Sequence, residues 1–324
     1  MIIDCHVHIS AFTHGHGHMS ERLLKSLAFR FMRMRLGIWG TDESTERTIE
    51  TRLVQTIDQT REIDAAVVLA FDAVYDRDGR PDPSRTHIHV TNDYVTEVVA
   101  RHPGKMLLGC SVNPYRKDAV AELERCVKAG AVLMKWLPVT QAFNPADDRC
   151  IPLYDAMAHH KLPLLCHTGY EQALPILDIA TADPTLLELP LERGVTVIAA
   201  HCATRSLPWQ RDYLPKFVRL AHEYEHFYGD TAALNFPTRW YAYTSLLNDQ
   251  TVRNKLVHGS DWPILPVPSP RRVGFFESFR LMHEPNWMRR DVLIKRKMGF
   301  DDAYWHRAAK ILRIAEKSEP PGKP

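Results

Sequence analysis

The sequence predicts an α/β protein, a distorted (β/α)8 barrel of the TIM type, and three observations support this prediction. Along the 324-residue chain, about eight short apolar segments alternate with helix-like stretches, as in parallel β/α units. The apolar segments are almost continuous, which is typical of strands buried on both faces. The competing architecture, an open doubly wound sheet, normally has a glycine-rich phosphate loop after its first strand. This chain has His-Val-His there instead.

The predicted strands follow one another from the first residue onward. In chain order they cover residues 1–10, 65–71, 106–112, 131–136, 162–167, 195–201, 226–232 and 255–260. Helices are expected over 44–62, 90–101, 119–128 and 153–160, and an amphipathic helix over 300–314 is expected on the outside of the barrel. We therefore predict a single domain over residues 1–316 and a disordered tail over 317–324.

Residues 11–41 form an expected insertion after the first strand. It begins with His14, His16 and His18 interleaved with glycines, for which a mobile loop is favoured over a metal site because glycine leaves the geometry unfixed. Residues 21–36 follow as a basic and apolar helix. We interpret this helix as a lid or an oligomer contact and not as a membrane anchor, because its basic excess is local and modest.

Charge and cysteine usage exclude several classes of protein. The 41 basic and 39 acidic residues give a formal net charge of +2, which argues against a nucleic-acid-binding or polybasic membrane surface. No apolar run is long enough to cross a bilayer, and no signal peptide is recognisable. The 6 cysteines have no CxxC spacing, so they indicate core residues of a cytoplasmic protein, without disulfides or a thiolate zinc site.

Polar side chains stand at the carboxyl ends of several predicted strands. Alternate residues of a strand share a face, so the two histidines of His-Val-His project side by side, as metal ligands can. In a barrel the carboxyl ends of the strands meet at one face, where active sites lie. The residues that share this position are His6, His8, Lys135, His167, His201 and Asp261. Each alone has an ordinary structural explanation, but together they indicate a metal centre.

Four motifs resemble the amidohydrolase superfamily. They are Ile-Asp-Cys-His-Val-His at the start, Leu-Pro-Leu-Leu-Cys-His-Thr-Gly at 162–169, Val-Ile-Ala-Ala-His-Cys at 197–202 and His-Gly-Ser-Asp-Trp-Pro at 258–263. The closer resemblance is to the amidohydrolase 2 branch, which includes aminocarboxymuconate-semialdehyde decarboxylase and related metal-dependent decarboxylases and lactone hydrolases. The motifs occur in the family's order over almost the whole chain, and the resemblance implies the same distorted barrel.

The resemblance also implies a role for each strand-end residue. His6, His8, His167 and Asp261 would bind a first divalent metal, and His201 would bind a second metal or act on the substrate and the water. Lys135 matches a lysine that is carboxylated in binuclear members and unmodified in mononuclear ones, so one metal and two metals both stay open. Zinc is the expected metal because the site is rich in histidine, with manganese and iron as alternatives.

The expected function is that of a metal-dependent hydrolase acting on a small carbonyl substrate such as an amide, lactone or ester. The metal would activate a water, Asp261 would be the general base, and His201 would stabilise charge on the carbonyl oxygen. One alternative is a metal-dependent non-oxidative decarboxylase of a small carboxylate, with aromatic carboxylates among the candidates. The other is a barrel that has lost catalysis and only binds.

Five residues near predicted strand ends are candidates for the substrate pocket: Trp136, Tyr170, Arg205, Arg239 and Trp262. An arginine there could bind a carboxylate, and Arg239 is the favoured one. A small carboxylate-bearing molecule is therefore the expected substrate, and a homodimer is the expected assembly. The sequence does not identify the substrate further.

Overall fold

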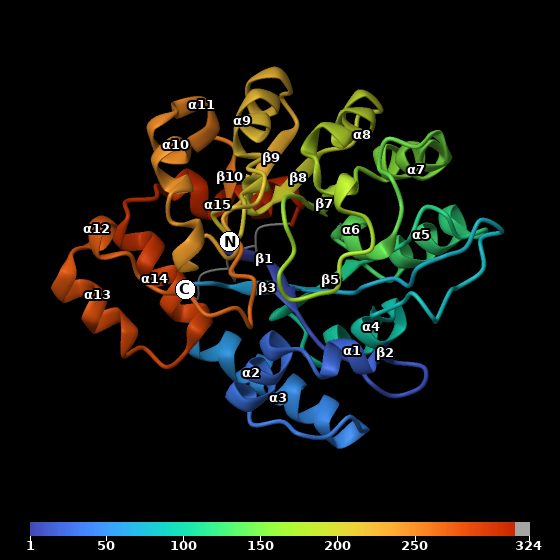
Figure 1. The fold of residues 1–324 in the computed structure, drawn as a ribbon, viewed down its shortest axis with the longest axis horizontal. Helices are drawn as coiled ribbons and strands as arrows, with labels where there is room; N and C mark the ends of the chain where they lie inside the picture. Colours follow the sequence, from blue (N-terminus) through green and yellow to red (C-terminus); the bar gives the residue numbers. More distant parts are fainter. Residues whose placement is uncertain (315–324) are drawn as a thin grey trace, which may run out of the picture.

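The computed structural model describes residues 1–314, and its central feature is one sheet of eight parallel strands in the order β1-β3-β5-β6-β7-β8-β9-β10 (Figure 1). Each lies within a predicted strand, so that prediction is confirmed. The strands are β1 (Ile3–His8), β3 (Ala65–Leu69), β5 (Met106–Cys110), β6 (Leu133–Trp136), β7 (Leu164–His167), β8 (Val197–Ala200), β9 (Phe227–Asp230) and β10 (Leu256–Val257).

Backbone hydrogen bonds between β1 and the segment after β10 close the sheet into a barrel. The Cys5 N–H donates to the His258 carbonyl (3.1 Å), and the His8 N–H donates to the Trp262 carbonyl (3.0 Å). The Asp261 N–H donates in turn to the His6 carbonyl (2.9 Å). The barrel is distorted because β10 is short and the pairing of β1 with β3 shifts its register between Asp4 and Val7.

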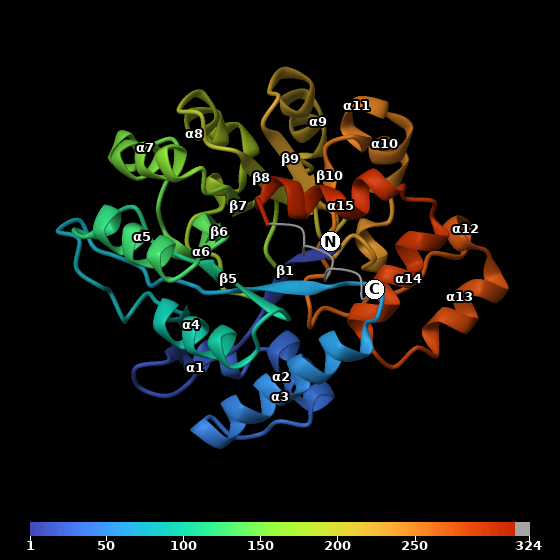
Figure 2. The same cartoon turned by 180° about the vertical axis from the view of Figure 1, so that it is seen from behind.

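Helices surround the sheet in a ring (Figures 1 and 2). The described helices are α1 (Glu21–Leu24), α2 (Leu27–Leu36), α3 (Glu43–Gln59), α4 (Asn92–Arg101), α5 (Ala119–Lys128), α6 (Pro138–Gln141), α7 (Ile151–His160), α8 (Glu188–Glu192), α9 (Leu214–Glu223), α10 (Ala242–Asn248), α11 (Gln250–Arg253), α12 (Pro270–Val273), α13 (Phe275–Met282), α14 (Trp287–Lys297) and α15 (Asp302–Ile311). No helix within residues 1–314 is long and apolar enough to span a membrane.

Several helix boundaries follow from capping side chains. Asp42, Thr91 and Asp301 accept hydrogen bonds from backbone N–H groups in the first turns of α3, α4 and α15. The single helix predicted over residues 21–36 is wrong, because Ser26 interrupts it. The Ser26 hydroxyl accepts a hydrogen bond from the Phe29 N–H, so α2 starts anew at Leu27.

The histidine-rich loop also differs from the prediction, because part of it has a fixed structure. Gly17–Met19 forms strand β2, which pairs antiparallel with β4 (Ile88–Val90). The His16 Nδ1 lies 2.6 Å from a carboxylate oxygen of Glu46, and its ring stacks on Tyr94. A buried carboxylate partner therefore supplies the order that the glycines alone do not.

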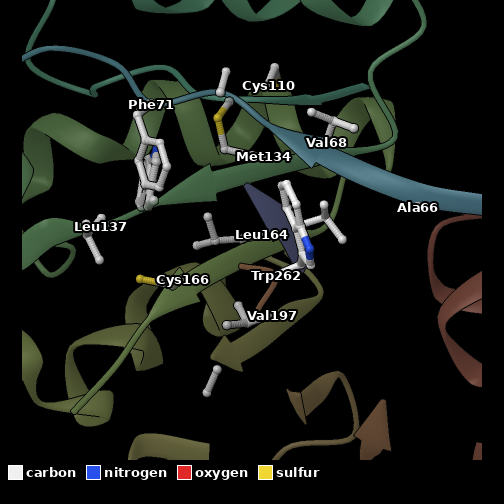
Figure 3. Close-up of a cluster of buried hydrophobic side chains, with 14 of the residues drawn as sticks. Ala66, Val68, Phe71, Cys110, Met134, Leu137, Leu164, Cys166, Val197 and Trp262 are labelled. Carbon is white, nitrogen blue, oxygen red and sulfur yellow. The ribbon is translucent and has the colours of Figure 1, made fainter. Parts of the chain in front are cut away.

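Buried side chains form two layers on either side of the strands. An inner cluster fills the barrel with alternate strand residues such as Val67 and Leu165. An outer cluster lies between the strands and the helices and includes Val68, Leu164 and Trp262 (Figure 3). All 6 cysteines are buried and free, as expected of core residues.

The last helix, α15, was expected on the outside of the barrel, and it lies across one end of it. Ala308 and Ala309 of α15 belong to the inner cluster with Ile3, so the helix covers the amino-terminal end of the barrel (Figure 2). This leaves the carboxyl-terminal end, with the polar strand-end residues, as the open face. The predicted tail over residues 317–324 lies outside the described residues.

Candidate metal centre and substrate cavity

Three ligand-type atoms from opposite ends of the chain converge at the mouth of the barrel. The Nε2 atoms of His6 and His8 are 3.2 Å apart, and Asp261 Oδ1 lies 3.4 Å and 3.0 Å from them. Tetrahedral zinc with bonds of about 2.0–2.1 Å requires ligand atoms about 3.3 Å apart. The spacing of these three atoms therefore fits a zinc-sized ion.

An irregularity in β1 gives both histidines this direction. Cys5 packs in the inner cluster but Val7 packs in the outer one, so the normal alternation changes between them. The register shift against β3 falls in the same stretch. It turns both His6 and His8 toward the barrel mouth.

Lys135 projects into the barrel beside His6. Its Nζ lies 3.1 Å from His6 Nε2, and its side chain is buried. Burial lowers the pKa of Lys135, although the carboxylates of Asp230 and Asp261 oppose this shift. A lysine that loses its proton readily is suited to metal binding or to carboxylation, as the resemblance implies.

His201 follows β8 and faces the same centre. Its Nδ1 lies 2.9 Å from the Ala232 carbonyl, which can only accept, so Nδ1 carries the proton. Burial lowers the pKa of His201 to about 3, so the ring is neutral and Nε2 is an unprotonated acceptor, 3.9 Å from Asp261 Oδ2. This tautomer suits a metal ligand or a proton acceptor. It does not suit the predicted role as a hydrogen-bond donor to a carbonyl oxygen.

His167, at the end of β7, lies edge-on to His201 with ring centroids 5.0 Å apart. Burial holds the pKa of His167 well below its ordinary value, so this ring is neutral too. Its Nε2 is buried and has no hydrogen-bond partner among residues 1–314. A buried, unsatisfied imidazole nitrogen is costly, and a metal ion or a substrate donor would satisfy it.

Asp230, at the end of β9, orients two of these histidines and was not identified from the sequence. Its Oδ2 lies 2.7 Å from His6 Nδ1, and its Oδ1 accepts a hydrogen bond from the His201 N–H (2.7 Å). Burial alone would raise the pKa of Asp230, but the His6 ring and the backbone donor hold it well below its usual range. Such a carboxylate–histidine pair fixes the tautomer of a metal ligand.

Glu171, in the loop after β7, is a second residue that sequence reasoning missed. Its Oε1 accepts hydrogen bonds from the backbone N–H groups of residues 172–174, and its Oε2 lies 3.6 Å from His167 Nδ1. Burial raises the pKa of Glu171. The carboxyl group faces the same cavity as the histidines.

The general-base candidate Asp261 is ionised in this setting. Burial alone would raise its pKa, but His6, His8 and His201 together hold it well below the usual range. Its backbone φ of +63° is unusual for a residue other than glycine and places the side chain over the barrel mouth.

Arg239 is the predicted pocket residue that the structure places at the site. Its guanidinium is buried and donates to the Ser206 hydroxyl (2.6 Å), the Thr204 hydroxyl (3.2 Å) and the Tyr170 carbonyl (3.3 Å). It lines a cavity together with His167, His201 and Asp261. Within the described chain, no carboxylate lies within 4.0 Å of it.

The other four predicted pocket residues are not among the residues that line the cavities at the site. Trp136 alternates with Lys135 along β6 and therefore faces outward, where its indole N–H donates to the Val112 carbonyl. Trp262 lies in the outer cluster (Figure 3). Tyr170 offers its backbone carbonyl to Arg239, and Arg205 stacks on Tyr241.

Part of the insertion over residues 11–41 lines the cavity at the candidate metal centre. Phe29, Met32 and Leu36 of α2 line a cavity whose opposite wall holds His6, His8 and Lys135. A role of this helix as a lid or in oligomer contacts stays a prediction.

Comparison with solved structures supports the barrel. An uncharacterized TIM-barrel protein from Bordetella bronchiseptica aligns at 17% identity with a TM-score of 0.65, covering 96% of this chain and 98% of that one. A probable 2-pyrone-4,6-dicarboxylic acid hydrolase from Acinetobacter baumannii aligns at 12% identity and a TM-score of 0.57, covering 97% and 99%. A 2,6-dihydroxybenzoate decarboxylase from Rhizobium aligns at 13% and 0.56, covering 97% and 98%.

These identities are low, so the solved structures show the shared fold and not the reaction. Among curated proteins, no match was found. The amidohydrolase family model, in contrast, matches residues 3–284, which include every candidate ligand described above. The family is metal-dependent, in agreement with the ligand spacing at the barrel mouth. This chain is a member of the amidohydrolase family.

Proposed function

We propose that the protein is a metal-dependent hydrolase that cleaves an amide, lactone or ester bearing a carboxylate. The observation that carries this proposal is the convergence of His6 Nε2, His8 Nε2 and Asp261 Oδ1 within 3.0–3.4 Å of one another. The neighbouring neutral rings of His167 and His201 are further ligand candidates. A histidine-rich set with one carboxylate favours zinc.

A divalent metal bound there would polarise the substrate carbonyl and lower the pKa of a water. The two carboxylate oxygens of Asp261 face different neighbours. Oδ1 faces the His6 and His8 nitrogens, whereas Oδ2 faces His201 across 3.9 Å. The carboxylate is therefore placed to accept the water's proton and to pass it to the leaving group. His201 Nε2 can hold the water or a second metal as an acceptor.

Arg239 supplies the positive charge that binds the substrate carboxylate. Ser206, Thr204 and the Tyr170 carbonyl fix the guanidinium, so little order is lost when an anion binds. The cavity that holds Arg239 also holds His201 and Asp261. A substrate anchored at Arg239 therefore presents its carbonyl group to the candidate metal centre.

The test is hydrolysis of a panel of carboxylate-bearing lactones, esters and amides by zinc-loaded, manganese-loaded and chelator-treated protein. We expect metal-dependent turnover that His8→Ala abolishes while the circular dichroism spectrum is retained. Asp155→Asn, at an exposed surface position, is the control. Turnover that survives complete metal removal would contradict the proposal.

A decarboxylase is the second candidate, and Glu171 is the observation that favours it. Loss of CO2 from a carboxylate leaves a carbon that must take up a proton. Glu171 has a raised pKa because it is buried, and it faces the cavity beside His167. Its Oε2 is therefore placed to hold that proton.

The two candidates predict different products from the same incubation. A decarboxylase releases one CO2 per turnover and, in D2O, leaves one deuterium on the product carbon. Glu171→Gln would then abolish turnover, whereas a hydrolase would depend more strongly on Asp261. Hydrolysis without CO2 release would exclude the decarboxylase.

A further inference from the structure

We propose that the substrate is amphiphilic, with one anionic group at Arg239 and an uncharged apolar body beneath α2. This inference rests on the proposed function, because it assigns the substrate class of the same site. It follows from two cavities that meet at the candidate metal centre.

The two cavities share the catalytic side chains but differ in their other walls. His167, Glu171, His201 and Asp261 line both. Only the first cavity reaches His6, His8 and Lys135, and only the second reaches Arg239. A molecule that occupies both cavities must therefore pass directly over His201 and Asp261.

The first cavity is apolar away from the candidate ligands. Its outer wall consists of side chains from α2, β4 and nearby segments, namely Met19, Phe29, Leu36, Ile38, Phe71 and Ile88. Among residues 1–314, the cation on this wall is Arg33; its Nη2 donates to the carbonyls of Trp39 and Gly40, and its Nε has no hydrogen-bond partner. Away from Arg33, these apolar side chains favour a hydrocarbon or an aromatic ring over a second carboxylate.

The second cavity has the opposite character at its inner end. Arg239 is buried there without a carboxylate partner within 4.0 Å in residues 1–314. A buried, unpaired charge is costly, and a bound anion would offset that cost. Apolar side chains surround the outer part of this cavity, including Leu27 and Phe236, which are 83% and 40% exposed.

The experiment measures binding and not turnover, using calorimetric titration of the zinc-loaded protein. The probes are benzoate, 4-ethyl-, 4-butyl- and 4-hexylbenzoate, with benzene-1,4-dicarboxylate as the doubly charged member. Each methylene buried in the first cavity should lower Kd by about fourfold until the cavity is filled. The dicarboxylate should bind more weakly than 4-ethylbenzoate.

Two variants test separately how the apolar cavity and Arg239 contribute to the binding affinity. Leu36→Asp should remove the dependence of Kd on tail length, because it places a carboxylate in the wall of the first cavity. Met34→Asp, on the same helix but 56% exposed and outside the cavity, is its matched control and should behave like the wild type. Arg239→Met should weaken all the carboxylates by a similar factor.

Three outcomes would overturn the inference: affinity independent of tail length, tighter binding of the dicarboxylate, or no binding of any probe. Failure of the proposed hydrolase activity would be a separate result. Tail-dependent binding without hydrolysis would refute the proposed reaction and keep the substrate class.

Discussion

Replacing Asp230 by asparagine is the sharpest test of how the metal centre is held. Asp230 lines neither of the two cavities, but its Oδ2 lies 2.7 Å from His6 Nδ1. A carboxylate there keeps the proton on Nδ1 and leaves Nε2 free for a metal. An amide NH2 in the same place would face that N–H donor to donor. The His6 ring would then favour the tautomer with its proton on Nε2, which cannot bind a metal.

The size of the expected loss in zinc affinity follows from this single contact between Asp230 and His6. The amide of Asp230→Asn would keep one oxygen for the His201 N–H, because Asp230 Oδ1 is the acceptor there. The fold should therefore survive, and the loss should fall on the metal. Removing the carboxylate behind a ligating histidine typically weakens metal binding about 10–100-fold. Since tenfold corresponds to about 1.4 kcal/mol, the expected cost is about 1.4–2.8 kcal/mol.

The assay is competition for zinc between the protein and a chromophoric chelator at fixed pH, with thermal unfolding of the metal-free protein as a check on the fold. Asp155→Asn is the control for the same change at an exposed site. Unchanged zinc affinity in Asp230→Asn would refute the assignment of Asp230 as the residue that orients His6. Loss of the fold in the metal-free variant would show that the role is structural.

Three further changes test other parts of the site. Asp261→Asn should lower kcat about 10²–10⁴-fold while zinc stays partly bound, and near-normal turnover with full metal would place the base elsewhere. Trp136→Ala should cost about 3–5 kcal/mol in urea unfolding because the ring is buried in the outer core, and a selective rise in KM instead would restore its substrate role. Burial alone would raise the pKa of Glu46, but hydrogen bonds from His16 and two backbone N–H groups lower it overall. Its contribution to stability is therefore present above the unfolded pKa of about 4.3 and is lost as pH falls through the folded value. Glu46→Gln should thus destabilise the protein at pH 7 and approach the wild type as pH falls through the lowered pKa of Glu46, and a difference that stays constant during this acidification would contradict the reasoning.

The strands and their order could be predicted because strands buried on both faces appear in the sequence as nearly continuous apolar runs. Each strand of the barrel is an apolar run, and its end is the point where a polar residue can face the mouth. The same rule applied to Asp230, which ends β9, but the residue lay outside the motifs used for the resemblance. The signal available in the sequence was a polar residue at the end of β9, the seventh strand of the barrel.

Other features depend on contacts that no local pattern records. Strand alternation alone does not say which of Lys135 and Trp136 faces inward, and the register shift in β1 reverses the side expected for His6 from Cys5. Glu171 lies in a loop, so its position at the cavity depends on tertiary packing. The break at Ser26 could have been predicted from its preference for the helix N-cap, but the apolar spacing across it dominated.

Anomalous diffraction from zinc-loaded crystals would test the central claim most directly. A zinc peak should lie about 2.0–2.2 Å from His6 Nε2, His8 Nε2 and a carboxylate oxygen of Asp261, because the structure already holds these atoms within 3.0–3.4 Å of one another. A stoichiometric zinc ion bound elsewhere, with these three side chains free of metal, would contradict the account.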